Sequence, residues 1–358
     1  MINARGTFTP LGVSRSSAQV RAAVARALGD FVKVDEYHDT VARELAVVAG
    51  TEAAMVTHCA AAAITLAVAA SMTGSELVQS LRLPDSSGLR RLVAIPAAHV
   101  VNYGHSILTD IRLAGAEPVV MDEGPDYDGE SLEQLLAGGQ FSAVLLVISR
   151  LTSVPGPKLA QMIRVARQRG VSVIIDAAAQ DLRITEIAAL GADVAIFSAQ
   201  KYLAGPTAGL AVGQRDFVAA MRLQEKGIGR AMKPSKEALA GVRAAVAQRA
   251  TLDWKVWRAR QDRKVDLLLA QVSSIAGLVA YAEPDPTGLP FRRICLCLSK
   301  RESWDAAVIA ETLRNGSPPV WVMDHRAAFG ELWLELVPLR KREVIALACR
   351  LQEVLGQV

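Results

Sequence analysis

The sequence predicts an α/β protein in which a large domain holds a mostly parallel sheet covered by helices on both faces, followed by a small α+β domain. Two observations lead to this fold class. Short apolar, β-branched runs of strand length recur between residues 53 and 199, and most are separated by helical segments. A proline-rich break, EPDPTGLP at 283–290, then precedes a shorter region of mixed strands and helices.

The elements follow in a regular order along the chain. Helical periodicity appears first at 17–30 and 39–50, and the second segment ends on Gly50, a helix stop. The predicted strands of the large domain are 53–57, 92–97, 118–122, 143–149, 171–176, 193–199 and 210–213. The main predicted helices between them are 59–70, 159–170 and 185–192.

The C-terminal part begins with a charged helical stretch, 236–272, predicted to connect the domains with one buried and one solvated face. After the proline-rich break the predicted strands are 292–299 and 331–338, and the predicted helices are 304–316 and 342–356. We therefore expect an N-terminal segment 1–40 that packs on the small domain or on a dimer partner, a large domain 41–250 and a small domain 251–358.

Composition excludes several classes of protein. The 358 residues carry 40 Lys and Arg against 36 Asp and Glu, a net charge of +4, without a run of five or six like charges. Neither a nucleic-acid-binding surface nor a membrane patch is expected. The four cysteines show no C-x-x-C spacing, and the N-terminus has no apolar export segment. A reduced, cytoplasmic protein is therefore predicted.

Two charged side chains follow strands of the large domain. Asp176 ends the strand of VSVIIDAAAQ, and Lys201 comes just after DVAIFSA. Because ligands bind at the carboxyl ends of strands in open parallel sheets, both groups should face one cleft. A desolvated lysine is a competent Schiff-base nucleophile, and a carboxylate can keep the ring nitrogen of a bound pyridine protonated. The pair indicates pyridoxal phosphate (PLP) as the cofactor.

The segment AAMVTHCAAAAITL predicts a site for the phosphate of this cofactor. A strand ends at Thr57 and an alanine-rich helix begins after a tight turn, so backbone N–H groups near Cys59, Ala60 and Ala61 can bind an anion. The hydroxyl groups of Thr57 and Ser198 can add donors.

Three histidines are candidates to stack on the cofactor ring. His99, in VAIPAAHVVNYGH, lies just past a strand end and ranks first, His58 ranks second, and His105 is a further rival.

Other catalytic motifs are weaker or absent. Ser198 and Lys201 also fit the S-x-x-K of penicillin-recognising acyl enzymes, but the S-D-N and K-T-G tripeptides of that family do not occur. G-x-G-x-x-G, Walker and H-E-x-x-H motifs are absent too. No dinucleotide, nucleoside triphosphate or metal site is predicted.

At these residues the chain resembles the fold-type I PLP-dependent enzymes of the selenocysteine synthase group, in particular members related to D-glucosaminate-6-phosphate ammonia-lyase. The resemblance covers nearly the whole chain. It includes INARGTFTPLG, THCAAAAITLA, VIIDAAAQ, FSAQKYLAGPTAGLAVG and GIGRAMKPSKEALAGVRAA. It implies a fold-type I sheet and a homodimer, or a multiple of dimers, that shares its active sites.

By this resemblance Lys201 would hold the internal aldimine, Asp176 would pair with the pyridine nitrogen, and Ser198 with the turn from Thr57 to Ala61 would bind phosphate. The Lys201 amine, once released, is the expected general base. The cofactor-binding residues that it implies are Thr57, His58, Cys59, Ala60, Asp176, Ser198, Gln200 and Lys201. The residues implied in contacts with the substrate or a neighbouring subunit are Arg230, Lys233, Lys236 and Arg326.

The chain departs from the pattern of this group at the lysine motif. Ala199 and Gln200 stand where the group has two glycines, and Ala204 replaces an arginine three residues after the lysine. Near the C-terminus, PPVWVMDHR has no arginine before Arg326. We expect a less anionic substrate, or a different hold on its carboxylate. Because the chain lacks an N-terminal extension for tRNA, seryl-tRNA is not the expected substrate.

The predicted function is a PLP-dependent lyase that eliminates a β-substituent from a small hydroxy amino acid or amino-sugar acid through a Cα carbanion. The same scaffold also serves racemases, aldolases, aminotransferases and selenocysteine synthase-like transferases. A non-catalytic protein that binds a ligand in the same fold is a further alternative.

Overall fold

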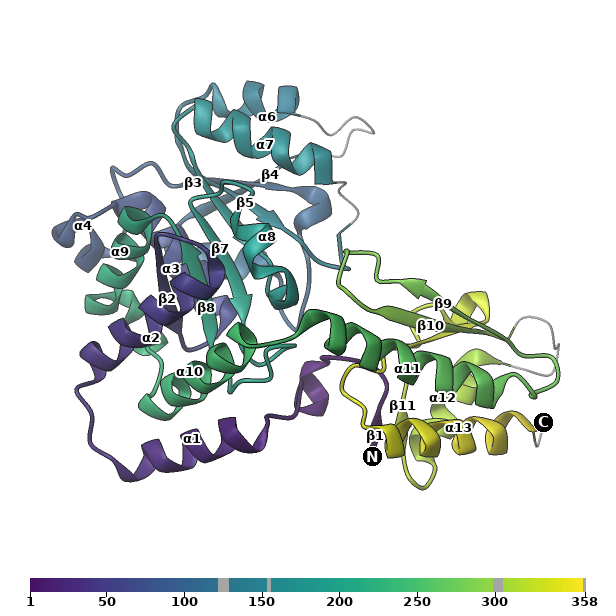
Figure 1. Cartoon of the computed structure of the whole chain (residues 1–358). Coiled ribbons are helices and arrows are strands. Elements are labelled where there is room, and N and C mark those ends of the chain that lie inside the picture. The colour runs from purple at the N-terminus through teal and green to yellow at the C-terminus, as the bar shows by residue number, and fades with distance from the viewer. Residues whose placement is uncertain (122–128, 153–155, 299–304, 357–358) are drawn as a thin grey trace. The chain divides into compact units, whose positions relative to one another are not determined.

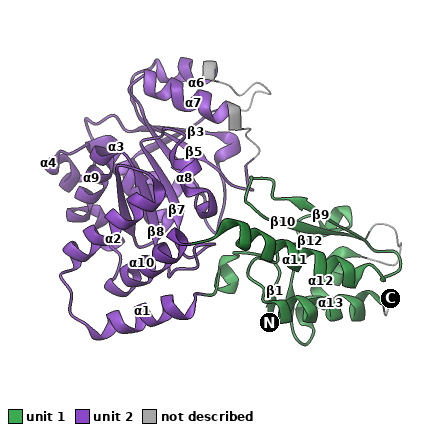
Figure 2. Ribbon diagram, in the orientation of Figure 1, with its two compact units in different colours: residues 1–15, 252–358 green, residues 16–251 purple. Residues whose placement is uncertain are grey.

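The computed structural model describes residues 1–121, 129–152, 156–298 and 305–356. They fall into two compact units, residues 16–251 and residues 1–15 with 252–358 (Figure 2). The predicted domain boundaries at residues 40 and 250 stay predictions. Within the predicted N-terminal segment, the boundary between the compact units follows Arg15. Asp122, Ser299 and Trp304, at the ends of predicted elements, lie outside the described residues.

The large unit, residues 16–251, is built on a seven-stranded sheet of order β2-β8-β7-β6-β5-β3-β4 (Figure 1). Its strands are β2 (Ala53–Thr57), β3 (Leu92–Pro96), β4 (Glu117–Met121), β5 (Phe141–Val147), β6 (Ser172–Asp176), β7 (Val194–Ser198) and β8 (Gly209–Gly213). Only β8 runs antiparallel to its neighbours in this sheet. The predicted mostly parallel sheet is confirmed.

Helices cover both faces of this sheet because its strands bury apolar side chains alternately on each side. On β5, Val144 and Leu146 join one core, and Ala143, Leu145 and Val147 join the other. The first core is closed by α2 (Val34–Ala49), α6 (Gly129–Leu136), α7 (Gly156–Gln168), α8 (Ile184–Ala188) and α10 (Lys236–Ala250). The second is closed mainly by α3 (Ala60–Thr73), α5 (Ile107–Leu113) and α9 (Arg215–Leu223).

Two further helices belong to this unit. α1 (Ala18–Gly29) packs on α10, and α4 (Leu77–Arg82) is a short helix that contacts α3. The helices α4, α5, α6 and α9 were not predicted from the sequence periodicity. The periodicity also placed the start of the second helix at residue 39, whereas α2 begins at Val34, where Asp35 and Glu36 suit a helix N-terminus.

The predicted helical connector 236–272 is two helices rather than one. α10 begins after Ser235 and ends at Ala250, and α11 (Trp254–Val272) begins after Asp253. The Asp253 carboxylate accepts a hydrogen bond from the Val256 N–H at 3.0 Å, which caps the new helix. The boundary between the two compact units falls in this interruption.

The small unit combines an antiparallel sheet with helices, as predicted. Its sheet has the order β12-β10-β9, and β1 pairs in parallel with β11. Its elements are β1 (Ile2–Asn3), α11, β9 (Val279–Pro284), β10 (Arg292–Cys297), α12 (Ala306–Asn315), β11 (Val320–Trp321), β12 (Glu331–Leu334) and α13 (Lys341–Gly356). In the described part of the chain, no helix has the length and apolarity needed to span a membrane.

Candidate active site

The carboxyl edge of the large sheet brings several predicted site residues into one row. Across three neighbouring strands, Thr57 is paired with Gly209, and Gly209 with Ser198. Asp176 lies opposite Ile196, two residues before Ser198 on β7. The strand ends of β2, β7 and β6 thus carry Thr57, Ser198 and Asp176 along the same edge.

Gly209 lets the strands approach closely at this edge. A Cβ atom at this position would overlap the Thr57 hydroxyl oxygen and the carbonyl oxygen of Cys59. Only glycine fits between β2 and β7 here, because any side chain would push the turn after β2 away from the sheet.

The turn after β2 leads into α3 with free backbone donors at its start. The first hydrogen bond within the helix runs from Ala63 N–H to the Cys59 carbonyl, and the Cys59 thiol accepts from the Ala62 N–H at 3.4 Å. The N–H groups of Ala60 and Ala61 precede these bonds and can bind an anion. Thr57 donates its hydroxyl proton to the Cys59 carbonyl at 2.8 Å. It therefore shapes the turn instead of donating to an anion in this structure.

Asp176 is a buried carboxylate with little compensation. It is 5% exposed, and the Ala178 N–H donates to its Oδ1 at 3.0 Å. Burial raises the pKa of Asp176 to about 6, partly offset by the Ala178 hydrogen bond and by the charge of Lys201, while the charge of Asp110 raises it further. The carboxylate therefore sits within electrostatic reach of the Lys201 amine.

Lys201 lies in the short loop that connects β7 to β8, and backbone hydrogen bonds hold the two ends of this loop together. The Ala199 N–H donates to the Ala208 carbonyl at 2.9 Å, and the Gly205 N–H donates to the Ala199 carbonyl at 2.8 Å. Lys201 itself is half-buried. Within this loop Ala204 adopts a left-handed backbone with φ of 55°, which costs a residue with a Cβ atom free energy.

His99 ends the short helical turn η2 (Ala97–His99) after β3 and is fully buried. Its Nδ1 accepts a hydrogen bond from the Val147 N–H at 3.0 Å. Burial lowers its pKa to about 4, so the ring is neutral at pH 7 and carries its proton on Nε2. Nε2 is buried and has no hydrogen-bond partner among the described residues. A buried donor of this kind indicates a place for a ligand atom.

His58 does not share the environment of His99. Its side chain is exposed and lines a pocket of about 680 Å³. The other residues that line this pocket are Val34, Thr207, Arg230, Lys233, Pro234, Ser235, Lys236, Glu237 and Ala238. Gln200 reaches its edge, because the Thr207 hydroxyl donates to Gln200 Oε1 at 2.7 Å. Three of the four residues predicted to contact substrate or a neighbour thus line one basic pocket, beside the turn after β2.

The fourth, Arg326, lies in the other compact unit. It is exposed, and its Nε is 2.6 Å from Glu331 Oε2. Its guanidinium also lies 4.9 Å from the centre of the Phe329 ring. Both contacts are local to β12 and the turn before it.

Sequence reasoning missed a second polar cluster near Asp176. Tyr103 donates its hydroxyl proton to Asp110, and His105 Nε2 lies 2.9 Å from the other carboxylate oxygen of Asp110. The charge of Asp110 raises the pKa of Asp176. The signal was present in VVNYGHS, a polar run with tyrosine and histidine directly after a strand end.

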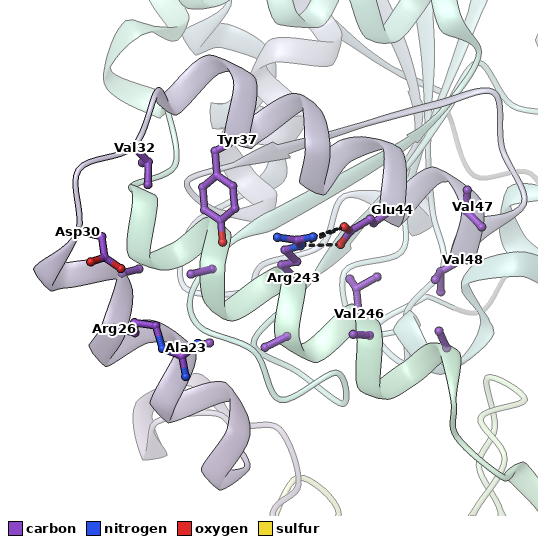
Figure 3. A pocket seen from close by; sticks show the side chains of 15 residues that line it. Ala23, Arg26, Asp30, Val32, Tyr37, Glu44, Val47, Val48, Arg243 and Val246 are labelled. Atoms are coloured by element: carbon purple, nitrogen blue, oxygen red, sulfur yellow. Dashed lines mark hydrogen bonds and ion pairs between the residues drawn. The ribbon is translucent and has the colours of Figure 1, made fainter.

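A second pocket of about 760 Å³ lies between α1, α2 and α10 (Figure 3). Its walls are mostly alanine and valine, and Arg243 and Glu44 pair with each other across it, with Nη2 2.6 Å from Oε1. None of the predicted site residues lines it. Its size alone does not make it the candidate active site.

The edge of the sheet can thus hold a group with two opposite ends. An anion fits the N–H groups at the start of α3, and a cation fits the buried carboxylate of Asp176. The Lys201 amine stands near the second position and can form a covalent bond with a carbonyl carbon. Among the residues that the structure describes, no cluster of three or more His, Cys, Asp or Glu side chains could hold a metal ion.

Comparisons with known proteins identify the family and the fold of the chain. The family model described as "Beta-eliminating lyase" matches residues 13–287. D-glucosaminate-6-phosphate ammonia lyase of Salmonella typhimurium is 30% identical over 358 residues, covering 99% of this chain and 95% of that protein. A solved structure of D-glucosaminate-6-phosphate ammonia-lyase superimposes with a TM-score of 0.87 at 29% identity, over 99% of this chain and 95% of that one.

Two other relatives have different activities. The 5'-C-glycyluridine monooxygenase-decarboxylase of a Streptomyces species is 29% identical over 358 residues, covering 99% of this chain and 90% of that protein. An L-seryl-tRNA(Sec) selenium transferase of Carboxydothermus hydrogenoformans is 25% identical over 222 residues, covering 58% of this chain and 45% of that protein. The resemblance found in the sequence motifs is confirmed.

Proposed function

Because this chain belongs to the beta-eliminating lyase family of fold-type I PLP-dependent enzymes, we propose that it binds PLP at the carboxyl edge of the large sheet. We further propose that it eliminates a β-substituent from a small hydroxy amino acid or amino-sugar acid. Lys201 and Asp176 carry the chemistry, and His99 and the start of α3 hold the cofactor.

The observation that supports this proposal best is the burial of the Asp176 carboxylate, which the Ala178 N–H and the charge of Lys201 offset only in part. A protonated ring nitrogen would supply the missing positive charge. The unpaired Nε2–H of His99 and the N–H groups of Ala60 and Ala61 are donors that suit a phosphorylated, oxygen-bearing ring. The donor set therefore fits PLP in both charge and polarity.

PLP, when bound, supplies an electron sink that makes the Cα–H of an amino acid acidic. Asp176 keeps the proton on the ring nitrogen, and its buried position makes this charge pair strong. The Lys201 amine removes the proton from Cα. The β-hydroxyl leaves with a proton as water, and hydrolysis of the released 2-imino acid takes up water and yields a 2-oxo acid and ammonia.

The basic pocket is the proposed site for the substrate's anionic end. Arg230 is exposed in it and makes no ion pair with a described residue, whereas Lys233 Nζ lies 3.9 Å from Asp35. A carboxylate would gain charge-assisted hydrogen bonds from Arg230 and Lys233. Because Ala204 stands where the group has arginine, we propose that a substrate without a phosphate group is preferred.

We propose that the protein is a homo-oligomer, with the basic pocket near a neighbour's site. The end of α1 and the stretch that follows it support a covered surface, since the side chains of Leu28, Phe31 and Val32 are exposed to 60%, 105% and 37%. Apolar side chains this open on a folded chain are typical of an interface.

A visible absorbance band on adding PLP tests the cofactor site. Wild type is expected to show a visible band that borohydride abolishes, because hydride converts the imine into a secondary amine that stays attached to the denatured protein. Lys201→Ala is expected to show neither the band nor the attachment. Lys226→Ala, on an exposed lysine of the same unit, should keep it. A Lys201→Ala protein that still forms the reducible band would show that another amine binds PLP.

Product analysis separates elimination from the other reactions of this scaffold. A screen of D- and L-hydroxy amino acids and amino-sugar acids should give ammonia and a 2-oxo acid in equal amounts, without an amino acceptor. Comparing D-glucosaminate with its 6-phosphate tests whether the enzyme prefers a substrate without a phosphate group. Racemised substrate, aldehyde release, or amino transfer without ammonia would assign a racemase, aldolase or aminotransferase.

Oxidative decarboxylation is a second candidate, because the monooxygenase-decarboxylase relative is 29% identical over the same 358 residues. It would consume oxygen and release carbon dioxide from an amino acid. An oxygen electrode in the same screen distinguishes it from elimination, which needs no oxygen.

A further inference from the structure

The loop after His99 holds a compact hydrogen-bonded cluster that the proposed reaction does not yet use. Asp110, on α5, is 2% exposed. One of its carboxylate oxygens accepts from the Tyr103 hydroxyl, and the other lies 2.9 Å from His105 Nε2. The two rings meet edge to face, with centroids 4.8 Å apart. Both oxygens of a buried carboxylate are therefore occupied by side-chain donors.

The backbone fixes this cluster beside the candidate active site. Asn102 bridges to Ser106, and the Ser106 hydroxyl caps α5. The Thr65 hydroxyl of α3 donates to the Asp110 carbonyl at 3.1 Å. Since α3 begins at the proposed phosphate turn and α5 packs on α3, Asp110 is tied to the element that starts the site.

We propose that Asp110, held by Tyr103 and His105, is a second carboxylate of the active site and acts as a positioning residue. Its negative charge acts on Asp176 and strengthens the hold of Asp176 on a proton at the cofactor's ring nitrogen. The inference rests on the proposed PLP site.

The electrostatic surroundings support this role. The charge of Asp110 raises the pKa of Asp176. Burial, the hydrogen bond to Asp110 and the charges of Asp110 and Asp176 raise the pKa of Tyr103. Asp110, Tyr103 and Asp176 are therefore close enough to influence one another electrostatically. A neighbouring unit charge at the effective dielectric constant of protein sites shifts a pKa by on the order of one unit.

Few other charges act on Asp110 from the packed elements. α3 carries no ionisable side chain after Cys59 at its start, and Arg112 of α5 is exposed. Glu117 on β4, the other element packed on α5, is exposed and lies 3.5 Å from Arg91. Burial raises the pKa of Asp110, and the hydrogen bonds from Tyr103 and His105 oppose this effect by favouring the charged form. His105 is 42% exposed and connects the cluster to solvent.

The test compares Asp110→Asn, Tyr103→Phe and His105→Ala in protein loaded with PLP. For Asp110→Asn we expect the pH midpoint of the cofactor's absorbance band to fall by about one unit and kcat to fall about tenfold, with a smaller change in KM. Tyr103→Phe and His105→Ala remove donors that keep Asp110 charged, so they should shift the midpoint in the same direction by less. Asp216→Asn, an exposed aspartate on α9, is the matched control and should match wild type.

Three outcomes decide the proposal. A lower midpoint in all three cluster variants supports it. An unchanged midpoint and kcat in Asp110→Asn overturns it and leaves a structural role. If Asp110→Asn does not fold, the half-exposed variants decide, and wild-type midpoints in both overturn the proposal. Wild type that shows no band with PLP contradicts the cofactor site itself, which is a separate failure.

Discussion

Asp176 and Asp181 lie five residues apart, and the fold treats their charges in opposite ways. Both are buried, 5% and 2% exposed, and burial raises the pKa of each. Asp181 has an arginine partner, with Arg249 Nη2 3.3 Å from Oδ2, and accepts from the Tyr202 N–H at 3.2 Å. Asp176 has one backbone donor and no arginine partner among the described residues.

We propose that this difference separates a structural carboxylate, Asp181, from a functional one, Asp176. Asp181 is satisfied within the chain and fixes the loop of Lys201 through its neighbour Tyr202. Asp176 keeps an unbalanced charge that a ligand can complete. Folded proteins leave buried charges unpaired rarely, because each costs free energy, and such charges concentrate at functional sites.

The largest expected effect comes from removing the unbalanced charge. Asp176→Asn should lower kcat for release of the 2-oxo acid by roughly 10²- to 10⁴-fold, the range for a group that holds a proton during the reaction. Saturating PLP and the exposed control Asp216→Asn separate this loss from weak cofactor binding. Activity within threefold of wild type would place the ring-nitrogen partner elsewhere.

Breaking the paired charge should instead unfold the protein more easily. Arg249→Ala leaves Asp181 buried without its cation and should lower the free energy of unfolding by about 3–5 kcal/mol. Arg243 lies on the same helix, α10, and pairs with Glu44 at the surface. Arg243→Ala should cost about 0–1 kcal/mol. Denaturant titration measures both, and equal losses would contradict the assignment of Asp181 as the structural carboxylate.

The pH dependence of stability should show how far the charge of Asp176 is uncompensated in the folded protein. The folded pKa of Asp176, about 6, exceeds the unfolded value of about 3.9, so the folded protein binds this proton more tightly. Its contribution is present below about pH 3.9 and is lost as the pH rises through 6. Two pKa units correspond to about 3 kcal/mol.

Denaturation of protein without added PLP, at pH 4 and pH 7, measures this contribution. Wild type should lose about 2 kcal/mol more stability than Asp176→Asn over this interval, because part of the linkage lies below pH 4. Parallel pH profiles for the two proteins would show that the buried carboxylate is compensated after all.

The smallest expected effect concerns the loop that Asp181 supports. Ala204 has a φ of 55°, which favours glycine. Ala204→Gly relieves this strain but loosens the unfolded chain, so we expect a net gain of about 0.5 kcal/mol in the free energy of unfolding. A loss of stability measured by denaturant titration would show that the Ala204 methyl group packs productively.

The sequence predicted most of the large sheet because its strands are apolar on both faces and end in polar residues. The strand of Ala53–Thr57 was placed without error, and Asp176, Ser198 and Thr57 do share the carboxyl edge. These inferences needed only local composition and the geometry of parallel sheets.

The hydrogen bonds that side chains make could not be predicted from local composition. Nothing in the sequence shows that the Thr57 hydroxyl donates to Cys59, or that Tyr103 and His105 converge on Asp110. These contacts join a loop to a helix or close a turn, and the backbone path decides them. The break between α10 and α11 was missed because both helices continue one charged periodic pattern, and only the cap at Asp253 interrupts it.

The close approach at Gly209 has a mechanical consequence. With no room for one carbon atom between this residue and the turn at Thr57 and Cys59, the start of α3 cannot move towards the sheet without displacing β8. A ligand bound at that turn is held with the stiffness of a seven-stranded sheet and not with that of a surface loop. The position of a ligand at this turn therefore depends on residue 209 having no Cβ atom.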